Sequence, residues 1–292
     1  MSEPVASVRN LSKRFGTKEA LIDVTAEVEQ GDVIGVLGKN GAGKTTLLEI
    51  LLGFSPPSAG STMIFGENSL QLSEAAKARI GFVPQQDELL GMLSGKQQVA
   101  IGAVFHKRWD HALIDRLLVD WEVPTDRRIH TLSVGERQKL SVLLALGHHA
   151  GLLVLDEPVA SLDPIARRRF LQELFDVGEN PTRAVLFSSH IVSDLERAAN
   201  KVWIIKDGRL YWQGYVDTLK ESVVRLHVRA RAPLPSVVPV PHRLACRVEG
   251  NRATVAVAEW SAAKRDALAK ELEADVEVEP LGLEEIFIEL HK

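Results

Sequence analysis

Three short runs of consecutive apolar residues stand out along the chain. They cover residues 33–37 (VIGVL), 152–155 (LLVL) and 184–187 (AVLF). An uninterrupted apolar run of this length is typical of a strand buried on both faces, as in a parallel sheet covered by helices. Residues 45–53 and 166–178, which follow two of these runs, have the composition of helices. The pattern therefore predicts an α/β core built around a mostly parallel sheet.

Different patterns precede and interrupt this core. The first 30 residues look like β-structure, and residues 21–28 alternate apolar with polar positions, so we expect an antiparallel β subdomain there. From about residue 87 to residue 147 the pattern is mostly helical, and apolar positions in residues 110–123 form one amphipathic stripe. We therefore expect a helical lobe at about 87–147, inserted into an α/β domain that covers residues 1–220.

The pattern changes again after about residue 220. Residues 223–230 alternate apolar and polar positions, and a proline-rich stretch follows them. Residues 261–274 read as a helix with Ser261 as its N-cap, and residues 283–290 read as a terminal helix. We expect residues 221–292 to form a small C-terminal α+β domain.

Composition narrows the class of protein. The chain has 292 residues, 45% of them hydrophobic, and a formal net charge of −4, which gives no argument for nucleic-acid binding. The single cysteine, Cys246, excludes an intramolecular disulfide and fits a reducing compartment. The first residues do not read as a signal peptide, and no apolar stretch approaches the roughly 20 residues of a membrane span. Any membrane role is therefore expected to depend on a partner.

A glycine-rich segment follows the first apolar run. Residues 38–46 read GKNGAGKTT, which contains G-x-x-x-x-G-K-T between a predicted strand and a predicted helix. In this context successive backbone N–H groups point into one concavity at a helix N-terminus, which binds phosphate. Lys44 is expected to reach the β- and γ-phosphates, and the hydroxyl of Thr45 is expected to bind Mg²⁺. The predicted nucleotide contacts in this loop are Gly38, Asn40, Gly41, Ala42, Gly43, Lys44, Thr45 and Thr46.

Four further motifs follow in order along the chain. The strand LLVL continues as Asp156-Glu157-Pro, LSVGE covers residues 132–136, SLD covers residues 161–163, and His190 follows the third apolar run. Together with the phosphate loop they resemble the nucleotide-binding subunit of an ATP-binding cassette (ABC) transporter. The resemblance covers roughly residues 5–220. It implies an α/β P-loop NTPase fold with ATP and Mg²⁺ as cofactors.

The resemblance also assigns roles around the phosphates. Asp156 would hold Mg²⁺, and Glu157 would polarise the attacking water. His190 matches the histidine that contacts the γ-phosphate in this family. Gln85 matches the glutamine near Mg²⁺ and the attacking water, although Gln86 stands beside it and only the Pro-Gln order favours Gln85. The catalytic set implied is therefore Glu157, His190, Gln85 and Lys44, and the metal ligands implied are Thr45, Gln85 and Asp156.

Three implied contacts would lie between two copies of the chain. In the family, the helix that begins at LSVGE faces the γ-phosphate bound by the opposite subunit, through Ser133 and Gly135. The segment departs from the family's LSGGQ, since Val134 replaces a glycine and Glu136 replaces the glutamine. An acid there is unfavourable near a phosphate unless it turns away, although Ser133 and Glu136 also have the spacing of a capping box. Asp163 would cross the dimer interface, or cap the helix before Pro164.

The resemblance also implies contacts with the adenine base and with a membrane partner. Phe15 matches the aromatic residue that stacks on adenine in the family. Residues 87–93 would contact a separate transmembrane permease, which would hold the protein at the cytoplasmic face of the cell membrane. The terminal segment, residues 281–290, resembles the ending of bacterial ABC-2 exporter subunits, which favours export.

These observations predict an ATPase that powers a membrane transporter as a head-to-tail homodimer with ATP. The alternative is a soluble ABC ATPase that acts on a macromolecular machine. Such proteins carry two cassettes or long coiled-coil insertions, and this sequence shows one set of motifs and no sustained heptads. A P-loop kinase or switch would leave LSVGE, SLD and His190 without a role.

Overall fold

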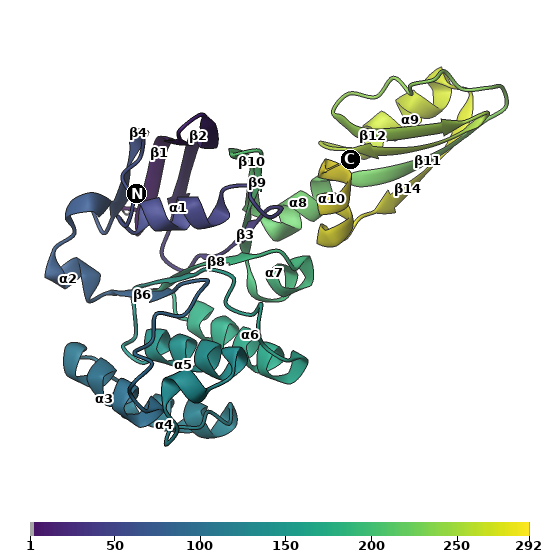
Figure 1. Cartoon of the computed structure of the whole chain (residues 1–292). Helices are drawn as coiled ribbons and strands as arrows, with labels where there is room; N and C mark the ends of the chain where they lie inside the picture. The colour runs from purple at the N-terminus through teal and green to yellow at the C-terminus, as the bar shows by residue number, and fades with distance from the viewer. Residues whose placement is uncertain (1–2, 292) are drawn as a thin grey trace. The chain divides into compact units, whose positions relative to one another are not determined.

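A computed structural model of the chain describes residues 3–291 (Figure 1). The chain divides into two compact units, one ending at Gln213 and the other beginning at Gly214. The boundary expected after residue 220 falls inside the short helix α8 (Val216–Ser222), which belongs to the second unit. Within residues 3–291 no helix is both long and apolar enough to cross a bilayer.

The first unit begins with a four-stranded antiparallel sheet in the order β2-β1-β4-β5. Its strands are β1 (Ala6–Phe15), β2 (Lys18–Val28), β4 (Ala59–Ile64) and β5 (Glu67–Asn68). In β2, Val24, Ala26 and Val28 are buried and the residues between them are exposed, as the alternating pattern predicts. The expected antiparallel subdomain is therefore present.

The central sheet of the first unit has six strands in the order β10-β9-β3-β8-β7-β6. Its strands are β3 (Val33–Leu37), β6 (Ile80–Val83), β7 (Leu152–Leu155), β8 (Ala184–Ser189), β9 (Lys201–Lys206) and β10 (Arg209–Tyr215). The pairs β6–β7, β7–β8, β8–β3 and β3–β9 are parallel. All three apolar runs are buried strands of this sheet, and their carboxyl ends lie at one edge.

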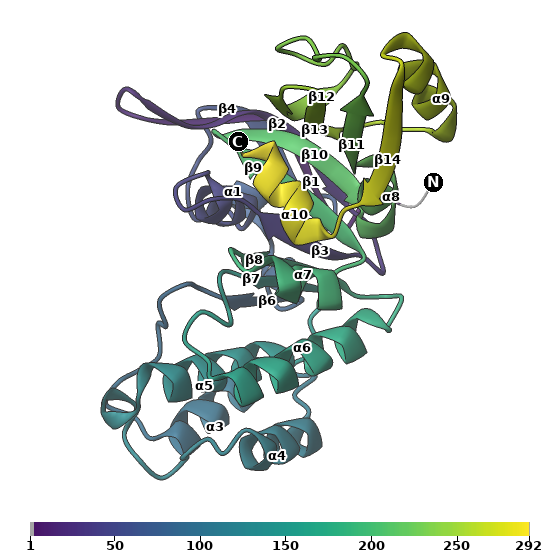
Figure 2. The same cartoon turned by 90° about the vertical axis from the view of Figure 1, so that its right-hand side faces the viewer.

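Helices cover both faces of the central sheet (Figures 1 and 2). They are α1 (Lys44–Leu51), α2 (Glu74–Lys77), α3 (Gly95–Phe105), α4 (His111–Asp120), α5 (Val134–Leu146), α6 (Pro164–Gly178) and α7 (Val192–Ala198), with single 3-10 turns at Ser69–Gln71 and Ile129–Thr131. In both views α1 lies on one side of the sheet, and α5 and α6 lie on the other. Helices α3, α4 and α5 form the expected helical lobe, in which Ile114, Leu117 and Trp121 are buried.

The second unit is a four-stranded antiparallel sheet with helices, ordered β12-β13-β11-β14. Its elements after α8 are β11 (Val224–Ala230), β12 (Arg243–Glu249), β13 (Arg252–Val257), α9 (Ala262–Glu271), β14 (Ala274–Pro280) and α10 (Leu283–Leu290). Leu226, Val255 and Val276 form its core with Leu268 of α9. Ser261 occupies the N-cap position, but its side chain makes no capping hydrogen bond. The expected α+β architecture is present.

Candidate functional site

A pocket of about 300 Å³ lies where the first strands, the phosphate loop and the central sheet meet. It is lined by Phe15, Lys18, Ala20, Asn40, Gly41, Gly43, Lys44, Thr45, Thr46, Gln85 and Glu157. Most of the residues predicted to contact a nucleotide therefore share one cavity. Lys18 and Ala20 also line the pocket, although no sequence motif predicted a contact for them.

The backbone of the phosphate loop depends on glycine at two positions. Gly41 and Gly43 have φ angles of 80° and 111°, in the region that favours glycine. A Cβ atom on Gly43 would lie 2.6 Å from the carbonyl oxygen of Ala20. Gly43 is the N-cap of α1 and offers no capping side chain, so the first N–H groups of this helix have no partner from it. A backbone of this geometry at the start of a helix is suited to bind an anion.

Lys44 and Glu157 form a buried charged pair beside the phosphate loop, and the exposed side chain of His190 bonds to Glu157. Lys44 Nζ lies 3.4 Å from Glu157 Oε1, and it donates a hydrogen bond of 2.8 Å to the carbonyl oxygen of Gly38. Lys44 and Glu157 are only 6% and 7% exposed. His190 Nδ1 lies 2.7 Å from Glu157 Oε2, and because a carboxylate only accepts, Nδ1–H is the donor. The cluster brings together three of the four predicted catalytic residues, and Gln85 lines the same pocket.

Asp156 lies directly beside this cluster and is held by a residue that sequence analysis missed. The hydroxyl of Ser188 donates a hydrogen bond of 2.5 Å to Asp156 Oδ1. Ser188 Oγ in turn accepts a hydrogen bond of 2.8 Å from the backbone N–H of Glu157. Ser188 is fully buried near the end of β8, two residues before His190. A polar residue near the end of an otherwise apolar strand is the sequence feature that could have indicated Ser188 as a site residue.

The oxygen donors near the phosphate loop fit a magnesium ion better than a softer metal. Thr45 and Gln85 line the pocket, and Asp156 directly precedes the lining residue Glu157. They offer a hydroxyl, an amide and a carboxylate oxygen, the ligand types that Mg²⁺ prefers. In the part of the chain that the structure describes, no group of three or more His, Cys, Asp or Glu side chains is placed to hold a metal. A magnesium ion here would therefore depend on phosphate oxygens for much of its coordination, as in P-loop enzymes.

Phe15 forms one wall of the pocket and is 53% exposed. Lys13 Nζ lies 4.9 Å from the centroid of its ring. This ammonium group also donates hydrogen bonds to Ser55 Oγ (2.8 Å) and to the carbonyl oxygen of Pro56 (2.6 Å). The cation supports the aromatic ring and leaves it open to the pocket, which suits a platform for a base.

The LSVGE segment begins α5, and Glu136 is turned back onto its own helix. Ser133 is the N-cap, with its hydroxyl accepting from the Glu136 N–H at 3.2 Å. Glu136 Oε2 accepts from the Ser133 N–H at 2.6 Å, and this hydrogen bond lowers the pKa of the Glu136 carboxyl below its usual value. The expected capping box is therefore present, and the acid is bound within it.

Ser133, Gly135 and Asp163 do not line the pocket of the phosphate loop. They form a separate surface on which α5 and α6 begin close together. A Cβ atom on Gly135 would lie 2.9 Å from the carbonyl oxygen of Ser161, so the two segments are in contact. Asp163 caps α6 by accepting hydrogen bonds from the N–H groups of Ile165 and Ala166, and these bonds lower its pKa. The capping role predicted for Asp163 is therefore present, and its contact across a dimer interface stays a prediction.

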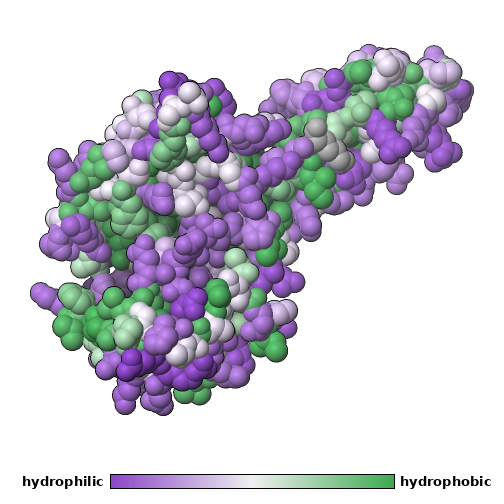
Figure 3. Space-filling view, in the orientation of Figure 1, coloured by the Kyte–Doolittle hydropathy of each residue, from purple (hydrophilic) through white to green (hydrophobic). Residues whose placement is uncertain are grey.

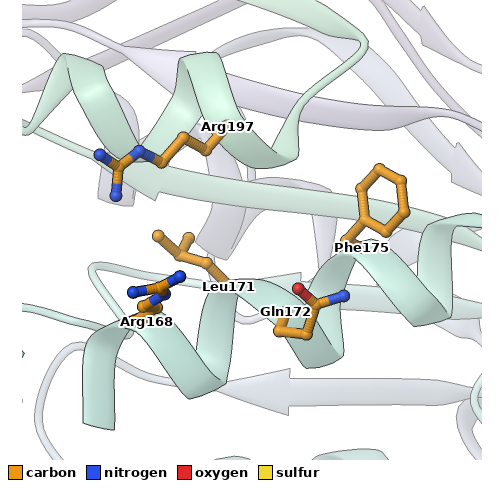
Figure 4. A pocket seen from close by; sticks show the side chains of 5 residues that line it. All are labelled: Arg168, Leu171, Gln172, Phe175 and Arg197. Atoms are coloured by element: carbon orange, nitrogen blue, oxygen red, sulfur yellow. The ribbon is translucent and has the colours of Figure 1, made fainter. Parts of the chain in front are cut away.

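A larger hollow of about 470 Å³ lies elsewhere, between α6 and α7 (Figure 4). It is lined by Arg168, Leu171, Gln172, Phe175 and Arg197. None of these residues belongs to a phosphate-binding motif, and the hollow contains no buried acid. Volume alone therefore does not identify the functional site, and the smaller pocket with convergent charged groups is the candidate.

Comparison with known proteins shows the family to which the chain belongs. A family model described as "ABC transporter" matches residues 21–160. The chain is 34% identical over 228 residues to the Nod factor export ATP-binding protein I of Burkholderia lata, covering 76% of this chain and 75% of the relative. It is 32% identical over 219 residues to the bacitracin transport ATP-binding protein BcrA of Bacillus licheniformis, covering 74% and 72%.

A solved structure shows the same fold. It is a dimeric post-hydrolysis state of an ATP-binding cassette bound to ADP and phosphate, with a TM-score of 0.64 and 22% identity. The match covers 72% of this chain and 98% of that chain. At this level of identity the likeness establishes the α/β cassette fold and nothing further.

Proposed function

The chain belongs to the family of ABC transporter ATP-binding proteins, and from this premise we propose that two copies hold two ATP molecules between them and drive a separate membrane permease. It is an ATPase that converts ATP and water into ADP and phosphate. The observation that carries the proposal is the division of the motifs over two surfaces. The phosphate loop and Glu157, to which His190 bonds, line one pocket, whereas Ser133 and Gly135 lie on another surface of the same unit.

Within one copy, the pocket would bind and position ATP. Phe15 would stack on the adenine, and the N–H groups of the phosphate loop with Lys44 would hold the phosphates. Thr45, Asp156 and Gln85 would hold Mg²⁺, which when bound neutralises phosphate charge. Glu157 would accept a proton from the attacking water, and the hydrogen bond from His190 Nδ1 would fix the orientation of its carboxylate.

The second copy would complete each site. The α5 N-terminus has unpaired N–H groups and a partial positive charge, which favour contact with the γ-phosphate in trans. The Ser133 hydroxyl accepts one hydrogen bond within the capping box and still has its proton to donate. Hydrolysis would remove the phosphate that bridges the two copies, and the dimer would then open. Transfer of this motion to a permease would produce transport.

The permease would dock on an apolar surface of the first unit. A hollow of about 590 Å³ is lined by Phe54, Leu70 and Phe82, among others, and an adjoining hollow that shares Phe82 contains Leu89. Phe54, Leu70, Leu90 and Met92 are exposed, and Figure 3 shows hydrophobic surface at its left side, around α1 and α3. An exposed apolar patch of this kind is typical of a protein interface. Docking there would hold the protein at the cytoplasmic face of the membrane.

The export direction also belongs to this proposal. Both relatives reported above are transport proteins, and the name of one specifies export. The terminal helix α10 keeps the segment that resembles ABC-2 exporter subunits. The alternative of a soluble ABC ATPase that acts on a macromolecular machine has no specific observation in its favour.

Two variants test the proposal. Lys44→Ala removes the buried cation of the phosphate loop and should abolish most ATP binding, measured by isothermal titration. Glu157→Gln should keep ATP binding, stop most hydrolysis and form dimers with ATP and Mg²⁺, measured by light scattering. Unchanged ATP affinity in the first variant, or a second variant that stays monomeric in the presence of its permease, would contradict the proposal.

A further inference from the structure

Glu136 presents a physical problem that the proposed function does not solve. It places a carboxylate in the first turn of α5, the helix end proposed to meet the γ-phosphate of the other copy. A charge there would oppose the helix dipole's attraction for an anion. The family motif has a neutral glutamine at this position, so a compensating cation is needed if the helix end is to remain attractive to phosphate.

The structure contains such a cation. Arg127 Nη1 lies 3.4 Å from Glu136 Oε1, on the oxygen that the capping box does not use. Arg127 Nη2 also donates a hydrogen bond to the backbone carbonyl of Thr131, which lies in the turn before α5. The guanidinium group is therefore bound both to the acid and to the backbone that leads into the helix. Its side chain is 52% exposed and that of Glu136 is 25% exposed.

A second capping box in the same chain shows that the charge is not needed for the cap. At the start of α3, Gln97 Oε1 accepts from the Ser94 N–H at 2.9 Å, and the Gln97 N–H donates to Ser94 Oγ at 3.2 Å. The box of Ser133 and Glu136 has the same two bonds with a carboxylate in place of the amide. A neutral amide can therefore replace Glu136 without loss of the capping geometry.

We propose that Arg127 is a positioning residue for ATP-dependent dimerisation, because it neutralises Glu136 and holds it against the α5 N-terminus. This inference rests on the proposed function, since it concerns the surface that would contact the γ-phosphate in trans. In the parent chain the pair has no net charge. Removal of Arg127 leaves Glu136 without its ion-pair partner, with only Lys139 as a further cation that acts on it, and replacement of Glu136 by glutamine leaves a net positive charge.

The test measures dimer formation against ATP concentration, with Glu157→Gln as the background in which hydrolysis is slow. Light scattering follows the dimer for Arg127→Gln, Glu136→Gln, the combination of both, and Arg127→Lys. Arg128→Gln is the matched control, because it removes the same charge from the next residue, which has no ion pair with Glu136 among the described contacts. The steady-state KM and kcat for ATP are measured for the same substitutions with Glu157 intact.

If Arg127 compensates the charge of Glu136, the variants should differ in the ATP concentration at half-maximal dimer formation in a specific order. Arg127→Gln should raise the ATP concentration at half-maximal dimer formation by about threefold, the scale of one charge at a helix end. Glu136→Gln should lower it, and the combination should return it to the parent value. Arg127→Lys should stay close to the parent. KM should follow the same order with kcat changed by less than about twofold, and raising the salt to about 0.5 M should shrink the differences.

The outcomes separate the two proposals. If the Glu157→Gln parent does not dimerise with ATP and permease, the proposed function fails before Arg127 is considered. If the parent dimerises but Arg127→Gln behaves like Arg128→Gln, the role of Arg127 is overturned alone. A defect in Arg127→Gln that Glu136→Gln does not reverse would also overturn it, because Arg127 would then act only through its bond to Thr131.

Discussion

Glu157→Gln should affect stability as well as hydrolysis. The substitution replaces a buried carboxylate by an amide of the same shape, and it removes the negative partner of Lys44 at 3.4 Å. At an effective dielectric constant of about 20, two charges at this distance attract by roughly 5 kcal/mol before desolvation is subtracted. Removal of one partner leaves the other charge buried, although Lys44 keeps its hydrogen bond to Gly38. We expect the free energy of unfolding without nucleotide to fall by about 3 kcal/mol, the lower end of the range for breaking a buried pair, because Lys44 keeps its bond to Gly38.

ATP should reverse this loss, since its phosphates would take the place of the carboxylate beside Lys44. The added stability from ATP and Mg²⁺ should therefore be larger in the variant than in the parent, while hydrolysis falls by about 10²–10⁴-fold. Urea unfolding with and without nucleotide measures the first effect, and single-turnover phosphate release measures the second. Glu271→Gln, an exposed position on α9, is the control. A variant with parental stability without nucleotide and parental hydrolysis would refute the roles assigned to this pair.

Three further predictions concern other parts of the first unit. Burial lowers the pKa of His148 to about 4, so between pH 6.5 and 4 the unfolded chain binds a proton that the folded chain does not. The free energy of unfolding should therefore fall by about 2 kcal/mol from pH 7 to pH 5. Urea unfolding should show a smaller fall for His148→Asn. Gly135→Ala places a methyl group against the Ser161 carbonyl, so titrations should show ATP binding retained while light scattering shows weaker dimerisation. Phe15→Ala should weaken ATP binding by about 5- to 100-fold in titrations, whereas Phe15→Tyr should keep it; equal affinity in Phe15→Ala would exclude stacking.

The phosphate loop and the central sheet could be predicted because they depend on local rules. An apolar run followed by glycines and a helix signal fixes the loop at the carboxyl end of β3. The same rule places Asp156 and His190 after the neighbouring strands β7 and β8, and parallel pairing brings those strand ends to one edge. The order of the strands in the sequence and their apolar, parallel-sheet character were therefore sufficient to predict that these residues lie at the same edge of the sheet.

Contacts between residues distant in sequence could not be predicted in this way. Ser188 bonds to Asp156 across two strands, and no motif distinguishes it from Ser189. The pairing of Arg127 with Glu136 depends on the path of the chain before α5. The sequence of that turn has no periodic pattern from which its conformation could be predicted. The expected boundary after residue 220 and the division at Gly214 differ by the length of α8, whose buried Val216 and Leu219 resemble those of a helix of the first unit.

The central claim is that ATP is held between the phosphate loop of one copy and α5 of another. Cysteines at Asn40 and Val134, both exposed, test this directly in a Glu157→Gln chain whose native Cys246 is replaced by serine. Under mild oxidation with ATP and Mg²⁺, the account predicts a disulfide between two chains, absent without nucleotide and absent in Lys44→Ala. A dimer that forms with ATP but never links Asn40→Cys of one copy to Val134→Cys of the other would contradict it.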